Sequence, residues 1–315
     1  MKGFNVSELT CNYLKNPIGI DTIPRFSWKL FSDIRAQHQT AYRLLISSSK
    51  EKLISGIIDV WDSGKISCSQ SIHVNYEGKA LSPCTRYYWR VIAFDIEDMP
   101  FESEIAYFET GKLNEKWNAN WITANYIQKE ASAYAAPYLR TSFDINKKVA
   151  NARLYICGLG YFEAYINGVK ASNDVLSTAF TRYDSTVLYL TYDVTNTLKA
   201  GANAFGVILG NGWYNCFAED PWNTRQATWR HWPKVIAELH IKFDDNSETI
   251  INTNPSWKST QSPITFNGIR NGEYYDARLE ITGWNTPEFD DSNWDKTKII
   301  RAPGGILKAF EMQPI

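Results

Sequence analysis

The sequence has no long apolar run and no excess of charge of either sign. Nothing in its 315 residues approaches the ~20 consecutive apolar residues of a membrane span, and residues 1–20 lack the apolar centre of a secretory signal peptide. Its 33 Lys and Arg residues balance 34 Asp and Glu residues, so it offers no basic surface to nucleic acid or to an acidic membrane. We therefore expect neither nucleic acid nor a membrane among its partners.

Cysteine is scarce, odd in number and irregularly spaced. The five residues are Cys11, Cys68, Cys84, Cys157 and Cys216. This pattern favours reduced thiols over a disulfide framework, so we expect a cytoplasmic location, or a secreted or periplasmic one if a signal peptide was removed. The four histidines lack zinc-ligand spacing with one another or with the cysteines, and no GxSxG or GxxxxGK[ST] motif occurs. These absences argue against a metal hydrolase, a serine hydrolase and a P-loop enzyme.

Aromatic residues are abundant along the whole chain, with 12 Trp, 18 Tyr and 15 Phe, and such residues are favoured in β-strands. Residues 17–111 form short aromatic and β-branched segments separated by turn residues, which predicts a β-sandwich. Four of these segments have strand length: 24–30, 41–48, 87–95 and 104–111. The stretch "LSPCTRYYWRV" resembles a fibronectin type III module, in which its Tyr and Trp residues would be structural.

A second domain is predicted to begin near residues 112–118, which divides the chain into domains 1–114 and 115–315. Within it, "YFEAYINGVK" alternates apolar and polar residues up to Asn167–Gly168, the dipeptide that a type I′ hairpin turn requires. Residues 237–243 also alternate, with Glu238 on the polar side of a half-buried strand. A short helical turn is expected after Asp193, with Thr195 as its N-cap. We therefore predict an all-β protein with a second sandwich of jelly-roll type.

Glycoside hydrolysis needs two carboxyl groups on opposite sides of a cleft. The sequence offers Glu273 with Asp276, and Asp290 with Asp291. The first pair lies on one short segment and the second lies in a polar turn, where an Asx-type hydrogen bond is the simpler explanation. We therefore predict no catalytic residue, and keep hydrolysis by Glu273 and Asp276 only as a third hypothesis.

The run "LGNGWYNCFAEDPWNTRQATWRHWP" places four Trp residues among Gly, Asn, Asp and Arg, with neither helical nor strand periodicity. Either these rings stack on a sugar whose hydroxyls are bound by the polar residues, or they fix a long loop to the domain beneath. Composition alone leaves both interpretations open.

Three longer stretches carry a resemblance to a known family. They begin "GLGYFEAYINGVKASNDVLSTAFTRYDS", "NGEYYDARLEITGW" and "RAPGGILKAFEMQPI", and the first unit contributes "NPIGID" and "PRFSW". Together they resemble the N-terminal region of bacterial α-L-rhamnosidases of glycoside hydrolase family 78, with a fibronectin-like domain followed by a jelly-roll, galactose-binding-like sandwich. The resemblance implies an enzyme that hydrolyses terminal α-L-rhamnose by inversion, using acidic residues of an (α/α)6 barrel further along the chain.

What the resemblance implies for this chain is a non-catalytic region that supports a catalytic barrel. The alternative is a rhamnose-binding module, since in some relatives this sandwich holds its sugar through calcium. The implied calcium ligands are Asp184 and Asn211. The implied sugar contacts are those two residues with Asn167, Trp213, Trp222 and Arg225. Its partners would be a rhamnose-containing glycan and the catalytic domain.

Overall fold

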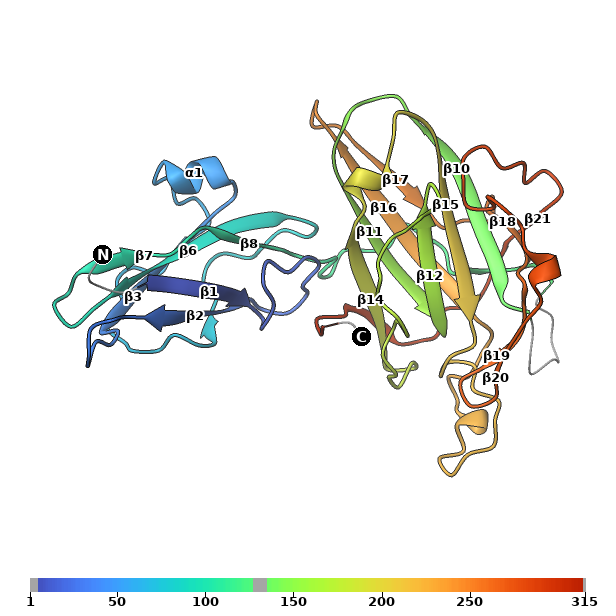
Figure 1. Ribbon diagram of the computed structural model, residues 1–315, viewed down its shortest axis with the longest axis horizontal. Helices are drawn as coiled ribbons and strands as arrows, with labels where there is room; N and C mark the ends of the chain where they lie inside the picture. The colour runs from blue at the N-terminus through green and yellow to red at the C-terminus, as the bar shows by residue number, and fades with distance from the viewer. Residues whose placement is uncertain (1–4, 127–134, 314–315) are drawn as a thin grey trace. The chain divides into compact units, whose positions relative to one another are not determined.

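The computed structural model describes residues 5–126 and 135–313, and the chain forms two compact units, Met1–Glu115 and Lys116–Ile315. Strands make up almost all of the regular structure, and α1 (Lys50–Ile54) is the α-helix found among the described residues (Figure 1). The prediction of an all-β protein is confirmed. None of the helices in the described ranges has the length and apolar composition needed to cross a bilayer.

The first unit contains two sheets. One has the strand order β1 (Asn5–Cys11), β2 (Arg25–Phe31) and β5 (Val74–Asn75). The other has the order β4 (Trp61–Asp62), β3 (Ala41–Ser47), β6 (Arg86–Phe94) and β7 (Pro100–Glu102), with β8 (Ala106–Glu109) also paired to β6. Side chains of β6 alternate between buried and half-buried positions, which is the pattern of a strand with one face on a core.

Large aromatic side chains fill the core of the first unit. Trp28 and Trp89 are both fully buried, and Phe26 lies between the sheets with its ring 4.6 Å from that of Trp89. The indole Nε1 of Trp28 donates to Oε1 of the buried Gln39 at 2.9 Å, because a buried N–H needs a partner. Trp89 therefore has the structural role predicted for it, and Trp28 has the same role.

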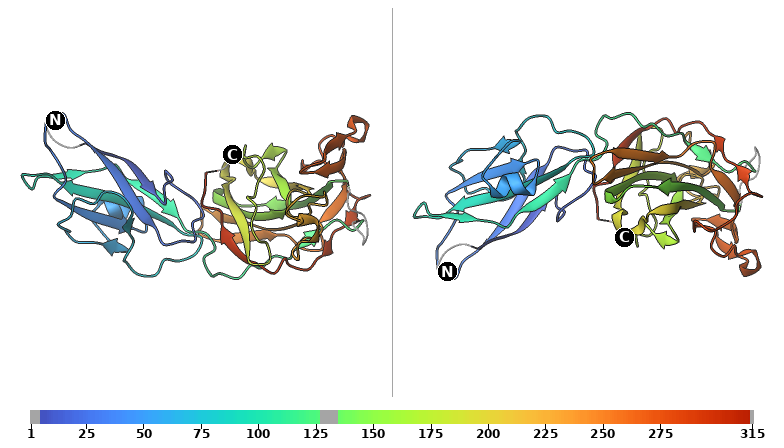
Figure 2. Two further views of the ribbon diagram at one scale, coloured as in Figure 1. Left: turned by 90° about the horizontal axis from the view of Figure 1, so that it is seen from below. Right: turned by 90° about the horizontal axis from the view of Figure 1, so that it is seen from above.

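The second unit is a larger sandwich (Figures 1 and 2). Its six-stranded sheet has the order β13 (Val169–Lys170), β12 (Tyr161–Ile166), β15 (Gly201–Gly210), β10 (Pro137–Ile145), β18 (Lys258–Gln261) and β21 (Asp295–Lys296). Its seven-stranded sheet has the order β22 (Lys298–Ile299), β9 (Ile122–Thr123), β16 (Lys234–Phe243), β11 (Val149–Leu159), β14 (Thr186–Asp193) and β23 (Ile306–Ala309), with β17 (Glu248–Asn252) on β16. A separate hairpin joins β19 (Ile264–Gly268) to β20 (Gly272–Tyr275).

Apolar side chains from both sheets meet in one core. Leu139, Phe205 and Val207 come from the six-stranded sheet, and Leu154 and Leu239 come from the seven-stranded one, each with no exposed surface. Burying a Val, Leu or Phe side chain is worth about 1.5–3 kcal/mol. This core fixes the ends of the strands from which the loops of the site extend.

The predicted Asn–Gly hairpin is present between β12 and β13. Asn167 has φ 52° and Gly168 has φ 81°, the left-handed values that a type I′ turn demands. The Asn167 side chain donates to the Thr197 carbonyl at 2.8 Å and to Asn203 Oδ1 at 2.7 Å, and it accepts from the Ala204 N–H at 2.8 Å. Its amide is therefore committed to holding the turn.

Two local expectations were wrong. The 3-10 helix η1 (Thr195–Thr197) starts at Thr195, so Val194 occupies the cap position, and the Asp193 carboxylate accepts from the Thr195 N–H at 3.0 Å. Glu238 is completely buried, because segment 116–120 covers that side of β16 and the Asn118 N–H donates to its carboxylate. Alternation along one strand could not show that a distant segment covers its polar face.

Candidate functional site

The Trp-rich loop and the β19–β20 hairpin extend from the same end of the second unit, below β12 and β15 in Figure 1. The loop follows β15, whose last residue, Gly210, pairs with Tyr161 at the start of β12. Asn267 of the hairpin accepts from the Asn211 N–H at 2.6 Å through its side chain and from Asn211 Nδ2 at 2.7 Å through its carbonyl. The start of the loop is therefore fixed to the hairpin close to the hairpin turn.

Between these segments the sheet face carries a hollow of about 560 Å³. Its lining comes from β12, β15, segment 174–176 and the hairpin, and includes Tyr161, Glu163, Asp174, Ile208, Asn267 and Glu273. Small-molecule sites usually have volumes of about 300–1,000 Å³ and combine apolar walls with a few polar groups. The hollow has both properties.

Glu163 is held in a fixed position within this hollow. Lys170 Nζ donates to its Oε1 at 2.6 Å, and the Tyr165 hydroxyl donates to its Oε2 at 2.5 Å. Burial, reinforced by the Glu163 carboxylate, raises the pKa of the Tyr165 hydroxyl, so this group stays protonated and remains a donor. The hollow thus presents acceptor oxygens suited to the hydroxyls of a neutral ligand.

An aromatic cluster adjoins the hollow and fixes the first part of the loop. The Trp213 ring lies 5.7 Å from that of Phe180. The fully buried Tyr214 packs edge-on against Tyr183 at 5.2 Å. Tyr214 therefore anchors the first part of the loop, whereas Trp213 is only half-buried.

Trp222 has a different environment at the tip of the loop, where 73% of its surface is exposed. The Arg270 guanidinium of the hairpin turn lies 5.1 Å from the Trp222 ring and 5.5 Å from the Trp213 ring, so one cation contacts both indoles. Asp220 accepts from the Trp222 N–H at 2.8 Å and from Thr224. The Thr224 hydrogen bond is the main reason that the pKa of Asp220 is lowered, and this carboxylate orders the tip.

A second hollow of about 510 Å³ lies beside the tip, against the 3-10 helix η2 (Thr224–Gln226). It is lined by Glu219, Asp220, Asn223, Arg225, Gln226 and Arg230. Arg225 Nη1 is 3.1 Å from Glu219 Oε1. An exposed indole next to such groups is an arrangement that can bind a sugar, since the ring offers an apolar face and the polar groups hydrogen-bond hydroxyls.

The two implied calcium ligands do not fit a calcium site in this arrangement. Asp184 Oδ1 accepts from Arg182 Nε at 2.8 Å and Oδ2 accepts from the Thr228 hydroxyl at 3.0 Å, and the Arg182 contact is the main cause of its lowered pKa. Asn211 Oδ1 accepts from Asn215 Nδ2 at 2.7 Å. Calcium needs six to eight oxygen ligands, and the part of the chain described by the structure contains no metal-binding group of three or more His, Cys, Asp or Glu.

Of the implied sugar contacts, Trp213, Trp222 and Arg225 share one end of the second unit with Asn211, and Asp184 reaches the same loop through Thr228. Asn167 lies at the opposite end of β12, since Tyr161 pairs with Gly210 and Ile166 pairs with Phe205. The geometry therefore gives no support to Asn167 as a sugar contact.

Three of the four candidate acidic residues hold parts of the fold in place. Asp276 accepts from the Arg278 N–H at the start of the 3-10 helix η3 (Ala277–Leu279) and pairs with the Arg278 guanidinium at 2.6 Å. Asp290 accepts from the Ser292 N–H at 2.9 Å, which is the Asx-type bond expected of it. Asp291 forms an ion pair with the buried Arg140. Glu273 is an exposed residue of β20.

Two basic residues lie where the Trp-rich loop meets β16: Lys234 is the buried first residue of β16, and His231 is a half-buried residue at the end of the loop. The Lys234 ammonium is buried, donates to the Arg301 carbonyl at 2.7 Å and lies 5.4 Å from the Tyr214 ring. Burial, with the charge of Arg301, lowers the pKa of Lys234 to about 7, and burial also lowers the pKa of His231 to about 4. In both residues, burial makes the positively charged form less favourable than it is in water.

Sequence reasoning missed Arg270, Tyr161 and Glu163. Arg270 lies between two Asn–Gly dipeptides in "FNGIRNGEYY". Because Asn–Gly is typical of hairpin turns, these dipeptides could have predicted a hairpin with Arg270 in its turn. Tyr161 and Glu163 were predicted on the polar face of β12, but nothing local showed that a hairpin would enclose that face.

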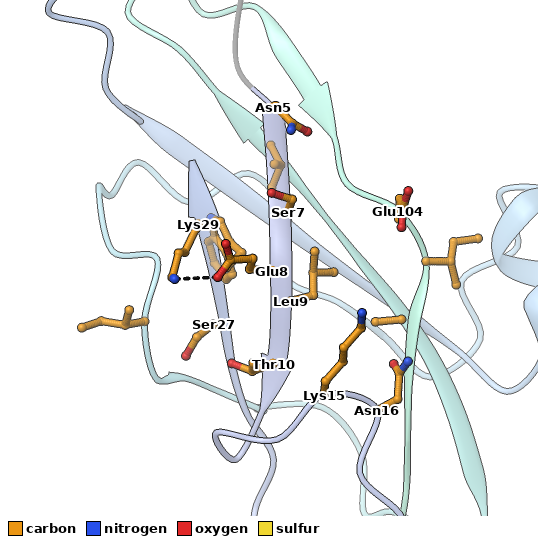
Figure 3. Close-up of a pocket in the computed structure, with 15 residues that line it drawn as sticks. Asn5, Ser7, Glu8, Leu9, Thr10, Lys15, Asn16, Ser27, Lys29 and Glu104 are labelled. Atoms are coloured by element: carbon orange, nitrogen blue, oxygen red, sulfur yellow. Dashed lines mark ion pairs between the residues drawn. The ribbon is translucent and has the colours of Figure 1, made fainter. Parts of the chain in front are cut away.

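The first unit has its own hollow of about 680 Å³ between β1, β2 and segment 104–106 (Figure 3). Glu8 within it is neutralised by Lys29 at 2.5 Å. Trp28 lines this hollow but is 1% exposed, so its ring offers no stacking face. This hollow therefore suits a sugar less well than the end of the second unit.

Comparison with known families gives two matches that together cover most of the chain. Residues 147–315 match the family described as the alpha-L-rhamnosidase N-terminal domain. Residues 6–114 match the family described as the Rha78A-like, N-terminal immunoglobulin domain. Immunoglobulin and fibronectin type III domains share the sandwich architecture.

Individual relatives are longer than this chain. An alpha-L-rhamnosidase of Formosa agariphila is 38% identical over 316 residues, which cover 92% of this chain and 33% of the relative. One from Alteromonas sp. is 37% identical, covering 95% and 34%. The solved alpha-L-rhamnosidase from Dictyoglumus thermophilum has a TM-score of 0.89 at 40% identity, covering 97% of this chain and 35% of that protein. The chain thus spans about a third of the length of these relatives.

Proposed function

Because the chain belongs to the family of alpha-L-rhamnosidase N-terminal domains, we propose that it is the non-catalytic N-terminal region of an α-L-rhamnosidase and that it supports the catalytic domain. The observation that carries this proposal is the match to alpha-L-rhamnosidases over about a third of their length. The rest of such an enzyme would contain the catalytic machinery, and its substrate would be a rhamnose-containing glycoside.

The roles of the acidic residues support this proposal. Hydrolysis requires one carboxyl group that can donate a proton and a second that acts from the other side of the bond. Asp276 and Asp291 are paired with Arg278 and Arg140, respectively, and Asp290 holds a turn. The Arg278 contact lowers the pKa of Asp276 and the Ser292 N–H lowers the pKa of Asp290, which is the opposite of the raised pKa that a general acid needs.

The first test is turnover of an aryl α-L-rhamnoside by the purified chain. We expect no release of the aryl alcohol above the buffer rate, because neither candidate acid pair, Glu273 with Asp276 or Asp290 with Asp291, provides the two opposed carboxyl groups that hydrolysis needs. Turnover that is lost in Glu273→Gln would overturn the proposal. The supporting role predicts, in addition, that a separately produced catalytic domain of the same gene gains thermal stability when this chain is added, and no gain would refute support.

A second function, binding of rhamnose at the tip of the loop, is favoured by the exposed Trp222 beside Arg270 and the polar hollow. A solved alpha-L-rhamnosidase of Streptomyces avermitilis, described as complexed with L-rhamnose, has the same fold at 22% identity and a TM-score of 0.89, covering 96% of this chain and 45% of that protein. That likeness shows the fold alone, so the binding proposal depends on the geometry of this chain.

Titration with L-rhamnose, followed by intrinsic Trp fluorescence, tests binding. We expect a saturable change that Trp222→Ala weakens about tenfold, the equivalent of about 1.4 kcal/mol for a lost stacking face. Phe31→Ala removes an exposed aromatic ring of the first unit and should leave the titration unchanged. Because Asp184 and Asn211 are already committed, we expect a chelator to have no effect. Absence of any saturable change at millimolar sugar would exclude this second function.

We also propose a cytoplasmic location. It is supported by the five cysteines, none of which forms a disulfide within residues 5–126 and 135–313. Thiol counting on protein purified without reductant tests it, and fewer than five reactive thiols after unfolding would contradict it.

A further inference from the structure

The chain contains four Asn–Gly dipeptides, which begin at Asn167, Asn211, Asn267 and Asn271. This dipeptide is chemically labile, because a Gly backbone nitrogen is not shielded by a Cβ atom and can attack the side-chain amide carbon of the preceding Asn. The attack requires the Asn side chain to rotate towards that nitrogen. Hydrogen bonds that hold the side chain elsewhere therefore protect it.

Three of the four side chains are held. The Asn167 amide makes the three hydrogen bonds of the β12–β13 turn. Asn211 is buried, with Nδ2 bonded to the Asn267 carbonyl and Oδ1 to Asn215. Asn267 is half-buried, and its Oδ1 accepts from the Asn211 N–H at 2.6 Å. Each must break at least one hydrogen bond in a partly or fully dry environment before it can react.

Asn271 differs in every respect. Asn271 is exposed at the turn of the β19–β20 hairpin. Its side chain makes no hydrogen bond with any residue in 5–126 or 135–313. Its backbone N–H donates to the Gly268 carbonyl at 3.0 Å, which leaves the side chain free. Gly272 has φ 82°, and a Cβ built there would meet nothing within 4 Å, so the attacking nitrogen lies in open surroundings.

We propose that Asn271 is a site of spontaneous deamidation and isoaspartate formation, selected from the four Asn–Gly dipeptides by the fold. The Gly272 nitrogen forms a bond to Asn271 Cγ and loses its proton, and the side-chain nitrogen leaves as ammonia, giving a five-membered cyclic imide. Water then opens the imide at either carbonyl. The products are Asp or isoaspartate, with no oxidation or reduction, and the net change is one water consumed and one ammonia released.

The modification acts on the hairpin that encloses the candidate site. It adds a carboxylate two residues from Glu273, and the isoaspartate form also inserts one methylene into the backbone of the turn. In the β19–β20 hairpin Gly268 pairs with Gly272 and Asn267 pairs with Glu273. An extra methylene in the turn therefore shifts β20 along β19 and disturbs both pairs. Asn267 also fixes Asn211 of the Trp-rich loop, and we therefore expect ageing at Asn271 to loosen the junction of loop and hairpin.

The test is incubation of the folded chain in mildly alkaline buffer, followed by tryptic peptide mapping. The four dipeptides fall in separate tryptic peptides, residues 154–170, 200–225, 259–270 and 271–278, so each is scored by mass spectrometry. Methyl transfer by an isoaspartyl methyltransferase provides a second readout. We expect peptide 271–278 to convert at least about fivefold faster than the others, since one retained hydrogen bond is worth about 1 kcal/mol or more and 1.4 kcal/mol corresponds to about tenfold.

The unfolded chain is the matched control. In concentrated denaturant all four peptides should convert within a few-fold of one another, and Asn271→Gln should remove the fast conversion from the folded chain. Equal rates for the four sites in the folded chain would overturn the proposal. A lead of Asn271 that persists unchanged in denaturant would also overturn it, because the selection would then come from neighbouring residues and not from the fold.

Discussion

Lys234 should make the stability of the second unit depend on pH, and Lys234→Met should remove that dependence. Lys234 is 1% exposed, and its pKa falls from 10.5 in the unfolded chain to about 7 in the folded one. Between these values the unfolded chain binds the extra proton, so stability rises with pH across this window, and the full penalty is present below pH 7.

The magnitude follows from the size of the shift. Each unit of pKa difference corresponds to about 1.4 kcal/mol, so a shift of about 3.5 units gives a penalty of up to about 5 kcal/mol at low pH. Lys234→Met removes this penalty. It also removes the hydrogen bond to the Arg301 carbonyl, and this loss lowers the stability of the variant by about 1–3 kcal/mol. We therefore expect a net gain in stability of about 2 kcal/mol or more near pH 7.

Urea unfolding of both proteins between pH 7.5 and 9.5 measures this effect. The two stabilities should converge by about 1.4 kcal/mol per pH unit, while tyrosines and cysteines contribute equally to both curves and cancel. Lys242→Met is the control, because this residue of the same strand has a 45% exposed side chain and should give a curve parallel to the wild type. Parallel curves for Lys234→Met would refute the reasoning.

Three further substitutions test the packing around the site. Asp291→Asn should cost about 3 kcal/mol, because it leaves the buried Arg140 guanidinium without its carboxylate; a loss below 1 kcal/mol in urea unfolding would contradict this. Gly206→Ala should cost about 1–3 kcal/mol, since its Cβ would lie 2.7 Å from Trp284 Cζ3, and near-UV circular dichroism should show the displaced indole. Asn167→Ala should cost about 2 kcal/mol through the lost turn geometry and hydrogen bonds, and an unchanged unfolding midpoint would contradict that role.

The sequence by itself determined the fold class, several strands of the first unit, the strand β16 and the Asn–Gly hairpin of β12 and β13. These features depend on local physical chemistry: alternation with a period of two places one face of a strand on a core, and a type I′ turn needs two residues with positive φ. Asn167–Gly168 supplied the turn, and Trp28 and Trp89 supplied the aromatic core of the first unit. Such signals are complete within a dozen residues, so no knowledge of distant contacts was needed.

The tertiary structure alone decided which surfaces form the candidate site. Asn211 and Asn267 are 56 residues apart in sequence, yet they join the Trp-rich loop to the hairpin, and Arg270 lies close to Trp213 and Trp222 only because that junction exists. The burial of Glu238 and the lowered pKa of Lys234 likewise come from segments that pack across the strand from far along the chain. Strand pairing sets these contacts. The free energy of pairing depends on side-chain packing across the whole sandwich, so no short stretch of sequence determines it.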